Sequence, residues 1–406
     1  MPERCADDVR AAAATVFREE AGHLVGRLIR ATGDFTLAEE SVQDALLAAL
    51  EHWLTDGIPR QPAAWLWTVS RRIALNRLAR DASYSAKLDA LAVLEEQGEG
   101  RHEPDDRLRL IFTCCHPALA REAQIALTLR AVCGFTTSEI ARAFVATESA
   151  VAQRIVRAQR KIKAAAIRYK MPSEEERADR LREALAVLYL MFNEGHLSSV
   201  ASAPFRRDLA KDAAWLMSLL CTWMPDEPEA LGLLALMKLS LSRADGRFDE
   251  RDDLVVLAHQ DRSRWDHAMI AEAVALIERA ASMHRIGPYQ IESAIAACHA
   301  ESKSFEATDW AQILALYDLL STLAPSPIVA LNRAVAVRQV LGPEAALAEV
   351  TQLEGALSGY HLFHAIRGQL WSDLGQIDLS RAAQSRALGL TENSAEQTLL
   401  RRRLFQ

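Results

Sequence analysis

The stretch that decides the fold is TSEIARAFVATESAVAQRIVRAQRKIK, residues 137–163. Thr137 or Ser138 can cap a short first helix, and Thr147 starts a second helix that ends in a basic tail. At 100° per residue, the other apolar side chains of the second helix fall within about 40° of Val151: Ile155, Ala158 and Ile162. The opposite face is polar: Ser149, Gln153, Arg157 and Arg160. A DNA recognition helix needs this division of faces, but an ordinary helix pair with a solvated basic face shows it too.

The chain has 406 residues, enough for two or three domains with hydrophobic cores. No apolar run reaches the roughly 18 residues of a membrane span, so we expect none. The N-terminus does not look like a signal peptide, because Asp7 and Asp8 interrupt it. The six cysteines include no CxxC pair, which favours a reduced, cytoplasmic location.

The net charge of −7 is unevenly distributed. Residues 1–170 contain 24 Lys and Arg against 22 Asp and Glu, a balance of +2, whereas the remainder contains 23 against 32, a balance of −9. The first part has two basic clusters: Arg71, Arg72, Arg77 and Arg80, and then Arg154, Arg157, Arg160, Lys161, Lys163, Arg168 and Lys170. An acidic stretch at 95–106 separates them. This arrangement indicates two separate phosphate contacts rather than one diffuse polycation.

Helical periodicity dominates the whole chain, without alternating segments bounded by hairpin turns, so the expected fold class is all-α. We expect helices at 11–30 and 37–54, and a third from Pro62 to about Arg80. The composition then predicts four parts: a helical domain at 1–80, an acidic linker at 81–104, a second helical domain at 105–171 and a larger helical domain at 172–406.

The expected third helix is apolar on two sides and carries one polar edge. The edge repeats every four residues, with Trp65 beside it: Thr68, Arg72, Asn76 and Arg80. Such an edge suits contact with a nucleic-acid backbone and stacking of an unpaired base on Trp65. Trp53 and Trp65 flank a Gly/Pro loop, which strengthens this hypothesis. The alternative is a core helix with a solvated edge, in which either tryptophan is simply buried.

The region after residue 172 contains seven helix-forming segments: 174–195, 208–224, 227–242, 265–283, 288–301, 308–323 and 327–340. Its last part indicates a repeat, because Gly342 and Gly375 each separate one helix from an Ala-rich helix. They lie 33 residues apart, close to the roughly 34-residue tetratricopeptide period. Such helix pairs form concave surfaces for peptides or neighbouring domains, although a bundle of unrelated helices also fits the sequence.

Taken together, these motifs resemble a bacterial sigma factor of the extracytoplasmic-function group, a sigma-70-type protein. AEESVQDALLAAL at 38–50 is similar to region 2.2, which binds RNA polymerase core, and AWLWTVSRRIALNRLAR at 64–80 to regions 2.3 and 2.4, which open and read the −10 element. SEIARAFVATESAVAQRIVRAQRKI at 138–162 resembles the region 4.2 helix-turn-helix that reads the −35 element. Through GPYQIESAIAACHA and APSPIVALNRAVAV, the region after 172 is similar to the tetratricopeptide-like extension of one subgroup. The resemblance implies a transcription initiation factor whose partners are RNA polymerase core and promoter DNA.

The resemblance also assigns site residues position by position. Those implied for core polymerase binding are Glu39, Glu40, Gln43 and Asp44. Those implied for the −10 element are Trp65, Thr68, Arg71, Arg72, Asn76, Arg77 and Arg80. Those implied for the −35 element are Ser149, Gln153, Arg154, Arg157 and Arg160. The acidic linker would traverse a positively charged polymerase channel.

Two features depart from the family's pattern. Val145-Ala146 stands at the turn of the helix-turn-helix, where a glycine is common. The cysteines of CCH at 114–116 cannot easily both ligate one metal, and no second pair has zinc spacing, so we interpret them as small buried apolar residues. No cofactor and no metal are expected, because the chain has no Walker loop, GxGxxG, nucleophile elbow or zinc signature.

Other function classes fit the sequence less well. A helix-turn-helix repressor would not need the helices at 38–50 and 64–80, and a tetratricopeptide scaffold would leave both arginine clusters without a task. An enzyme is the weakest alternative. Its best constellation lies in HQDRSRWDHA and could suggest metal or acid–base chemistry: His259, Asp261, Arg262, Asp266 and His267. Asp commonly caps helices and Arg pairs locally, so helix capping also explains them. A ligand-binding pocket in this region is a further alternative.

The acidic region 173–406 has two alternative roles in this interpretation. It could mask the two basic clusters when the factor is free, or brace the two DNA-binding domains on the polymerase. The sequence favours neither role.

Overall fold

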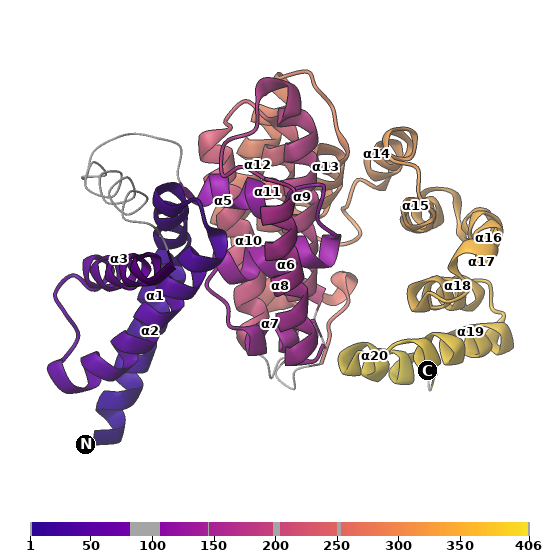
Figure 1. Ribbon diagram of the computed structural model, residues 1–406. Helices are drawn as coiled ribbons and strands as arrows, with labels where there is room; N and C mark the ends of the chain where they lie inside the picture. Colours follow the sequence, from indigo (N-terminus) through magenta and orange to yellow (C-terminus); the bar gives the residue numbers. More distant parts are fainter. Residues whose placement is uncertain (1, 82–105, 145, 198–203, 250–252, 405–406) are drawn as a thin grey trace. The chain divides into compact units, whose positions relative to one another are not determined.

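The computed structural model describes residues 2–81, 106–144, 146–197, 204–249 and 253–404 (Figure 1). These residues are helical throughout and contain no strand, only an isolated bridge between Phe248 and Leu254. The all-α class expected from the periodicity is confirmed. The chain forms two compact units, Met1–Leu190 and Met191–Gln406. The linker expected at 81–104 lies, apart from its first residue, outside the described residues.

The first unit begins with three helices that pack against one another: α1 (Pro2–Thr32), α2 (Phe35–Asp56) and α3 (Pro62–Asp81). The turn after α1 depends on Gly33, whose φ of 68° is a left-handed value that favours glycine. The Asp34 carboxylate then caps α2 by accepting a hydrogen bond from the Leu37 amide at 3.1 Å. Leu28, Val42 and Leu66, one from each helix, are buried in this group.

A second helical group in the same unit contains α5 (Asp106–Cys114), α6 (Arg121–Ala131), α7 (Thr137–Ala143) and α8 (Glu148–Ala164). Here α6 contacts α5, α7 and α8, and α7 packs on α8. The group also contacts α1 through α5 and α6. The following helix, α9 (Glu174–Leu197), is held to it by polar contacts of Arg180 and Glu183. Arg180 donates to the Phe112 carbonyl, and Arg121 pairs with Glu183 at 2.9 Å.

The second unit is a succession of helices that mostly pack on their neighbours along the chain. They are α10 (Pro204–Trp223), α11 (Pro228–Leu241), α12 (His267–Ser282), α13 (Pro288–Glu301), α14 (Trp310–Leu323), α15 (Pro327–Leu341), α16 (Pro343–Gln352), α17 (Glu354–Leu357), α18 (His361–Asp373), α19 (Ile377–Leu390) and α20 (Ser394–Leu404). Short 3₁₀ turns occur at Ala244–Gly246, Leu257–His259 and Arg262–Arg264. In the part of the chain that is described, no helix combines the length and apolar character that a membrane crossing requires.

The repeat expected around two glycines corresponds to two helix pairs, α15 with α16 and α18 with α19. Gly342 and Gly375 lie between the members of each pair with φ of 95° and 71°. These left-handed values explain why glycine recurs at the turn. The expected helices of this region agree with the observed ones within a few residues.

Candidate nucleic-acid interface

The polar face of α8 is exposed, and its apolar stripe is buried. Val151, Ile155 and Ile162 lie in the core. The residues expected to read DNA are exposed, except Arg154, which is half-buried: Ser149, Gln153, Arg154, Arg157 and Arg160. Arg157 donates to Gln153 at 3.2 Å, one turn away. This face is therefore accessible within the first unit and carries donors and acceptors of the kind that read base edges.

The helix before it begins one residue earlier than expected, because the cap is Thr136 rather than Thr137 or Ser138. The Thr136 hydroxyl accepts from the Glu139 amide at 3.2 Å, and the Glu139 carboxylate accepts from the Thr136 amide at 2.8 Å. This reciprocal pair satisfies two amides at once, which a cap at either later position would not. Thr147 caps α8 as expected, accepting from the Ala150 amide at 3.2 Å. Val145 lies outside the described residues.

The polar edge of α3 is also exposed. Thr68, Arg72 and Asn76 point away from the core, whereas Leu66 and Ala74 are buried. Arg71 and Arg77 are half-buried, and the side chain of Arg80 lies outside the described set. On another side of the helix, the Arg27 guanidinium lies 3.8 Å from the Trp67 ring centre. This stacking contact joins α3 to α1 and fixes the direction of the polar edge.

The two tryptophans beside the Gly/Pro loop differ in role. Trp53 is 2% exposed and belongs to the core. Trp65 is half-buried and contacts Trp53 edge-to-face, with ring centres 5.6 Å apart at 67°. It also lies 6.2 Å from the His52 ring. Trp65 is therefore the tryptophan whose surface remains open for stacking, and the buried Trp53 packs against it.

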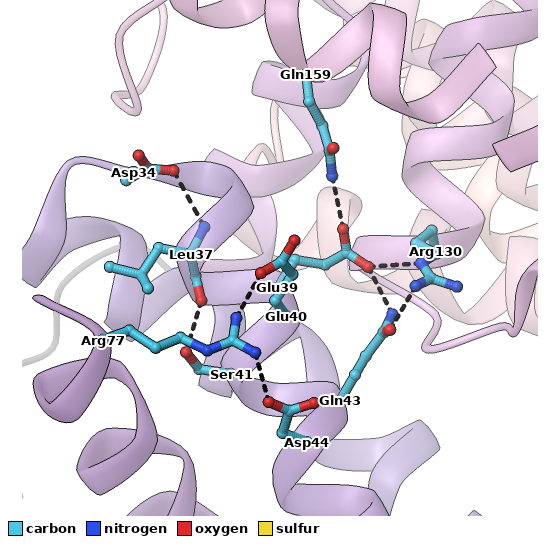
Figure 2. A network of polar contacts seen from close by, with 10 residues as sticks. All are labelled: Asp34, Leu37, Glu39, Glu40, Ser41, Gln43, Asp44, Arg77, Arg130 and Gln159. Atoms are coloured by element: carbon cyan, nitrogen blue, oxygen red, sulfur yellow. Dashed lines mark hydrogen bonds and ion pairs between the residues drawn. The ribbon is translucent and has the colours of Figure 1, made fainter. Parts of the chain in front are cut away.

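Arg77 joins two of the predicted sites. Its guanidinium pairs with Glu40 and, at 2.6 Å, with Asp44, both on α2 (Figure 2). An arginine expected at the −10 element thus contacts two carboxylates expected to bind polymerase. All three side chains are at least partly exposed, so this pair contributes little stability but orients both surfaces.

Glu39 is the most enclosed of the predicted polymerase-binding residues, at 4% exposed. Its carboxylate accepts hydrogen bonds from Gln43 on its own helix, from Arg130 on α6 at 2.5 Å and from Gln159 on α8 at 2.6 Å (Figure 2). Arg130 also donates to the side chains of Gln43 and Thr137. The donors satisfy a buried carboxylate that would otherwise be costly to desolvate. In this conformation Glu39 and Gln43 are occupied by the second helical group.

A second polar contact joins the two groups at Asp106. Its carboxylate pairs with Arg30 of α1 at 3.0 Å, and its backbone carbonyl accepts from the Tyr169 hydroxyl at 2.7 Å. Burial raises the pKa of Tyr169 well above its usual value, and the Asp106 carboxylate raises it further. Gly26 of α1 permits this approach, since a Cβ there would lie 2.4 Å from the Tyr169 hydroxyl.

Sequence reasoning missed Arg130, Gln159 and Asp106 as contact residues. Arg130 carried one signal, as the only charged residue in the apolar run 123–136. Such an arginine is seldom buried without a partner. The identity of that partner, 91 positions away, has no local signature.

The cysteines at 114 and 115 are fully buried, and Cys133 nearly so. Burial raises the pKa of the Cys115 thiol to about 12 and raises that of Cys114 as well. Both thiols are therefore neutral, and they pack as small apolar groups, in agreement with the sequence interpretation.

The HQDRSRWDHA constellation also serves local structure. The Asp261 carboxylate accepts from the Ser263 amide, and the Asp266 carboxylate caps α12 by accepting from the Met269 amide, both at 2.9 Å. Arg262 donates to the backbone carbonyls of His299 and Ser302. These bonds favour the capping explanation over acid–base chemistry.

The fold and these surfaces define a class: a helical protein with two helical groups that each expose a polar, arginine-bearing helix face, followed by a larger helical extension. Residues 16–84 match sigma-70 region 2, and residues 109–162 match sigma-70 region 4. Residues 180–281 match a family of unknown function, DUF6596.

A protein of Rhizobium meliloti (strain 1021), described as uncharacterized, is 43% identical over 389 residues, which cover 94% of this chain and 92% of that protein. No solved structure matches the chain. The chain belongs to the sigma-70 family, as an extracytoplasmic-function-type RNA polymerase sigma factor with a C-terminal extension. It acts in promoter recognition with RNA polymerase core. The sigma factor families that it matches are not families of enzymes.

Proposed function

We propose that α3 holds the single-stranded −10 element, that α8 reads the −35 duplex, and that the acidic side of α2 docks on RNA polymerase core. The observation that carries this proposal is the exposure of two polar helix faces in one unit, Thr68 to Asn76 on α3 and Ser149 to Arg160 on α8. A base stacked on Trp65 contributes about 1–3 kcal/mol, which offsets the cost of unstacking it. A bidentate contact from Gln153 or Arg157 discriminates a base by a similar amount, about 1–3 kcal/mol.

Polymerase docking requires a rearrangement in this proposal. Glu39 and Gln43 bind Arg130, so the second helical group must leave α2 before these residues can meet the polymerase. The factor then works in the cytoplasm, beside polymerase and DNA, and the polymerase supplies the chemistry.

Run-off transcription with core polymerase on a promoter library tests the proposal. A start site that appears only when the full chain is added supports it. Arg72→Ala and Asn76→Ala should then reduce promoter opening, whereas Gln153→Ala and Arg157→Ala should change the upstream sequence preference. Arg182→Ala is the control, since Arg182 is an exposed α9 arginine that pairs with Asp179. If these substitutions leave both the transcript output and the promoter preference unchanged, the residue assignments are wrong.

We further propose that the C-terminal extension regulates the sigma module, either by masking its basic faces or by bracing it on polymerase. Truncation after Leu197 tests this more cleanly than truncation at residue 173. The fragment that ends at Leu197 keeps α9, whose Arg180 and Glu183 bind the second helical group. A rise in promoter output means masking, a fall means bracing, and unchanged output contradicts a regulatory role.

A further inference from the structure

The second unit contains a cavity of about 600 Å³ that neither DNA nor polymerase binding explains. The loop 256–259 and helices α13, α14, α15, α18 and α20 all contribute to its lining. Its volume lies within the roughly 300–1,000 Å³ of small-molecule sites. A second cavity of about 280 Å³ shares four lining residues with it: Val335, Arg338, Gln369 and Arg403. The two hollows therefore adjoin each other at these residues.

One wall of the larger cavity is aromatic and rigid. The Trp310 ring packs edge-to-face on Phe305, with centres 5.2 Å apart at 67°, and on His299, with centres 5.1 Å apart at 70°. Burial, together with the neighbouring Arg243 and Arg262 cations, lowers the pKa of His299 to about 4, so its ring is neutral near pH 7. This wall offers flat apolar contact without a charge of its own.

The charged part of the cavity is cationic. Arg338 is held by Asp373, with 3.1 Å between its Nη2 and the carboxylate, and Gln369 donates to the same carboxylate at 3.0 Å. Arg403 has no acidic partner among the described residues. Burial lowers the pKa of Arg403, and the neighbouring Arg338 cation lowers it further. A half-buried guanidinium that has no acidic partner in the described part of the chain, beside a second guanidinium, is an arrangement that an anion stabilises.

The surrounding domain makes this charge notable. Residues 171–406 have a balance of 23 Lys and Arg against 32 Asp and Glu. No Asp or Glu is among the described residues that line the larger cavity. A positive hollow in an acidic domain selects for anions, because the walls concentrate the local field while the remaining surface repels them.

We propose that this cavity binds a small organic acid with a flat apolar body, the carboxylate on Arg403 and Arg338 and the body against Trp310 and Phe305. The planar guanidinium of Arg403 has a full set of donors for a carboxylate. Such a ligand contacts α14, α15 and α20 at once. The extension would then respond to a small molecule, which neither α3 nor α8 is proposed to bind.

The test is a titration of the full chain with 2-naphthoate, and with uncharged 2-naphthamide as the matched probe. Calorimetry should show saturable naphthoate binding and an affinity for naphthamide at least about tenfold weaker, since a charge-assisted pair is lost. Arg403→Gln should weaken naphthoate binding about tenfold, and Trp310→Leu should weaken both probes. Arg401→Gln is the control on the same helix, because Arg401 is exposed, bonds to Gln397 and does not line the cavity.

Each variant is checked for helical content and thermal unfolding, and Arg403→Lys keeps the charge if Arg403→Gln does not fold. The lysine variant should bind more weakly than the parent and still prefer naphthoate over naphthamide. Equal affinity for the two probes, unchanged binding by both Arg403 variants, or the same loss in Arg401→Gln would overturn the proposal. So would the absence of saturable naphthoate binding at about 1 mM, the weak end of measurable affinity.

Discussion

The proposed role of Glu39 in polymerase binding conflicts with its enclosed position in the structure. A polymerase-binding carboxylate must be accessible, yet this one is 4% exposed and bonded to Arg130, Gln159 and Gln43. Burying an ion pair is not strongly favourable in itself, because desolvation offsets the attraction. Breaking the pair is expensive, because the remaining charge stays in a poorly solvated site. Glu39 and Arg130 therefore act as a two-part contact that is stable when complete and costly when halved.

Substitution of one partner should show this cost. We expect Glu39→Ala to lower the free energy of unfolding of the first unit by about 3–5 kcal/mol, because the half-buried Arg130 would lose its carboxylate. The double change Glu39→Leu and Arg130→Met should cost less than the single change. Urea unfolding measures both, and Glu51→Ala, an exposed acid on the same helix, should stay within about 0.5 kcal/mol of the parent. A double variant as unstable as the sum of the singles would contradict the pair.

His299 gives a prediction for pH. Its folded-state pKa of about 4 is lower than the usual 6.5, because it is desolvated and faces Arg243 and Arg262. The unfolded chain therefore binds a proton at a higher pH than the folded chain does. The stabilisation from this group is fully present above pH 6.5 and is lost as the pH falls toward 4, by roughly 2–4 kcal/mol in all.

The measurement compares urea unfolding of the second unit at pH 7.5 and about pH 5. His299→Phe keeps an aromatic ring beside Trp310 and removes the titration, so its stability should fall less on acidification. His267→Phe, an exposed position on α12, should fall as the parent does. An equal fall in the parent and in His299→Phe would show that other groups control the acid response.

At the scale of elements, the periodicity of the sequence predicted which face of each single helix is buried and which is exposed. The buried stripe and polar face of α8, and the Thr68, Arg72 and Asn76 edge of α3, follow from residues three or four apart. The contact between Glu39 and Arg130 spans 91 positions, and the cavity brings α14, α15 and α20 together, so neither has a local signal. Such features depend on tertiary packing, which no window of the sequence contains.

Close packing of α1 on α5 gives a prediction at this scale. Gly26→Ala adds helix propensity of about 1 kcal/mol but places a Cβ 2.4 Å from the Tyr169 hydroxyl and 2.6 Å from Asp106. Overpacking typically costs about 1–3 kcal/mol, so we expect net loosening of the two helical groups. Hydrogen exchange should rise in α5 and change little in the second unit. Gly355→Ala, a helical glycine with no atom within 4 Å of its added Cβ, is the control for propensity alone.

At the scale of the whole molecule, the first unit combines two exposed helix faces that we propose bind DNA with one enclosed carboxylate, Glu39, that we propose binds polymerase. The α3 and α8 polar faces need no rearrangement, whereas Glu39 and Gln43 require the release of Arg130 and Gln159. In the proposed mode of docking, polymerase and the second helical group compete for the Glu39 carboxylate. Such competition reduces the apparent polymerase affinity by the fraction of chains in the open state.

This competition predicts that substitutions of Arg130 or Gln159 and a substitution of Glu39 affect the polymerase affinity differently. Arg130→Ala and Gln159→Ala weaken the closed state and leave every predicted polymerase-binding residue unchanged in identity. They should therefore tighten binding to core polymerase, by about 5- to 100-fold at most. Glu39→Ala also opens the contact but removes a polymerase ligand, so it should bind polymerase no better than the parent. Fluorescence anisotropy of labelled full-length chains with core polymerase measures both. The exchange of Arg130 for Lys separates charge from geometry, since a lysine cannot reproduce the fork that spans Glu39, Gln43 and Thr137. If all substitutions at the contact weakened polymerase binding alike, the contact would be part of the binding surface itself, and the closed arrangement would be the form that polymerase accepts.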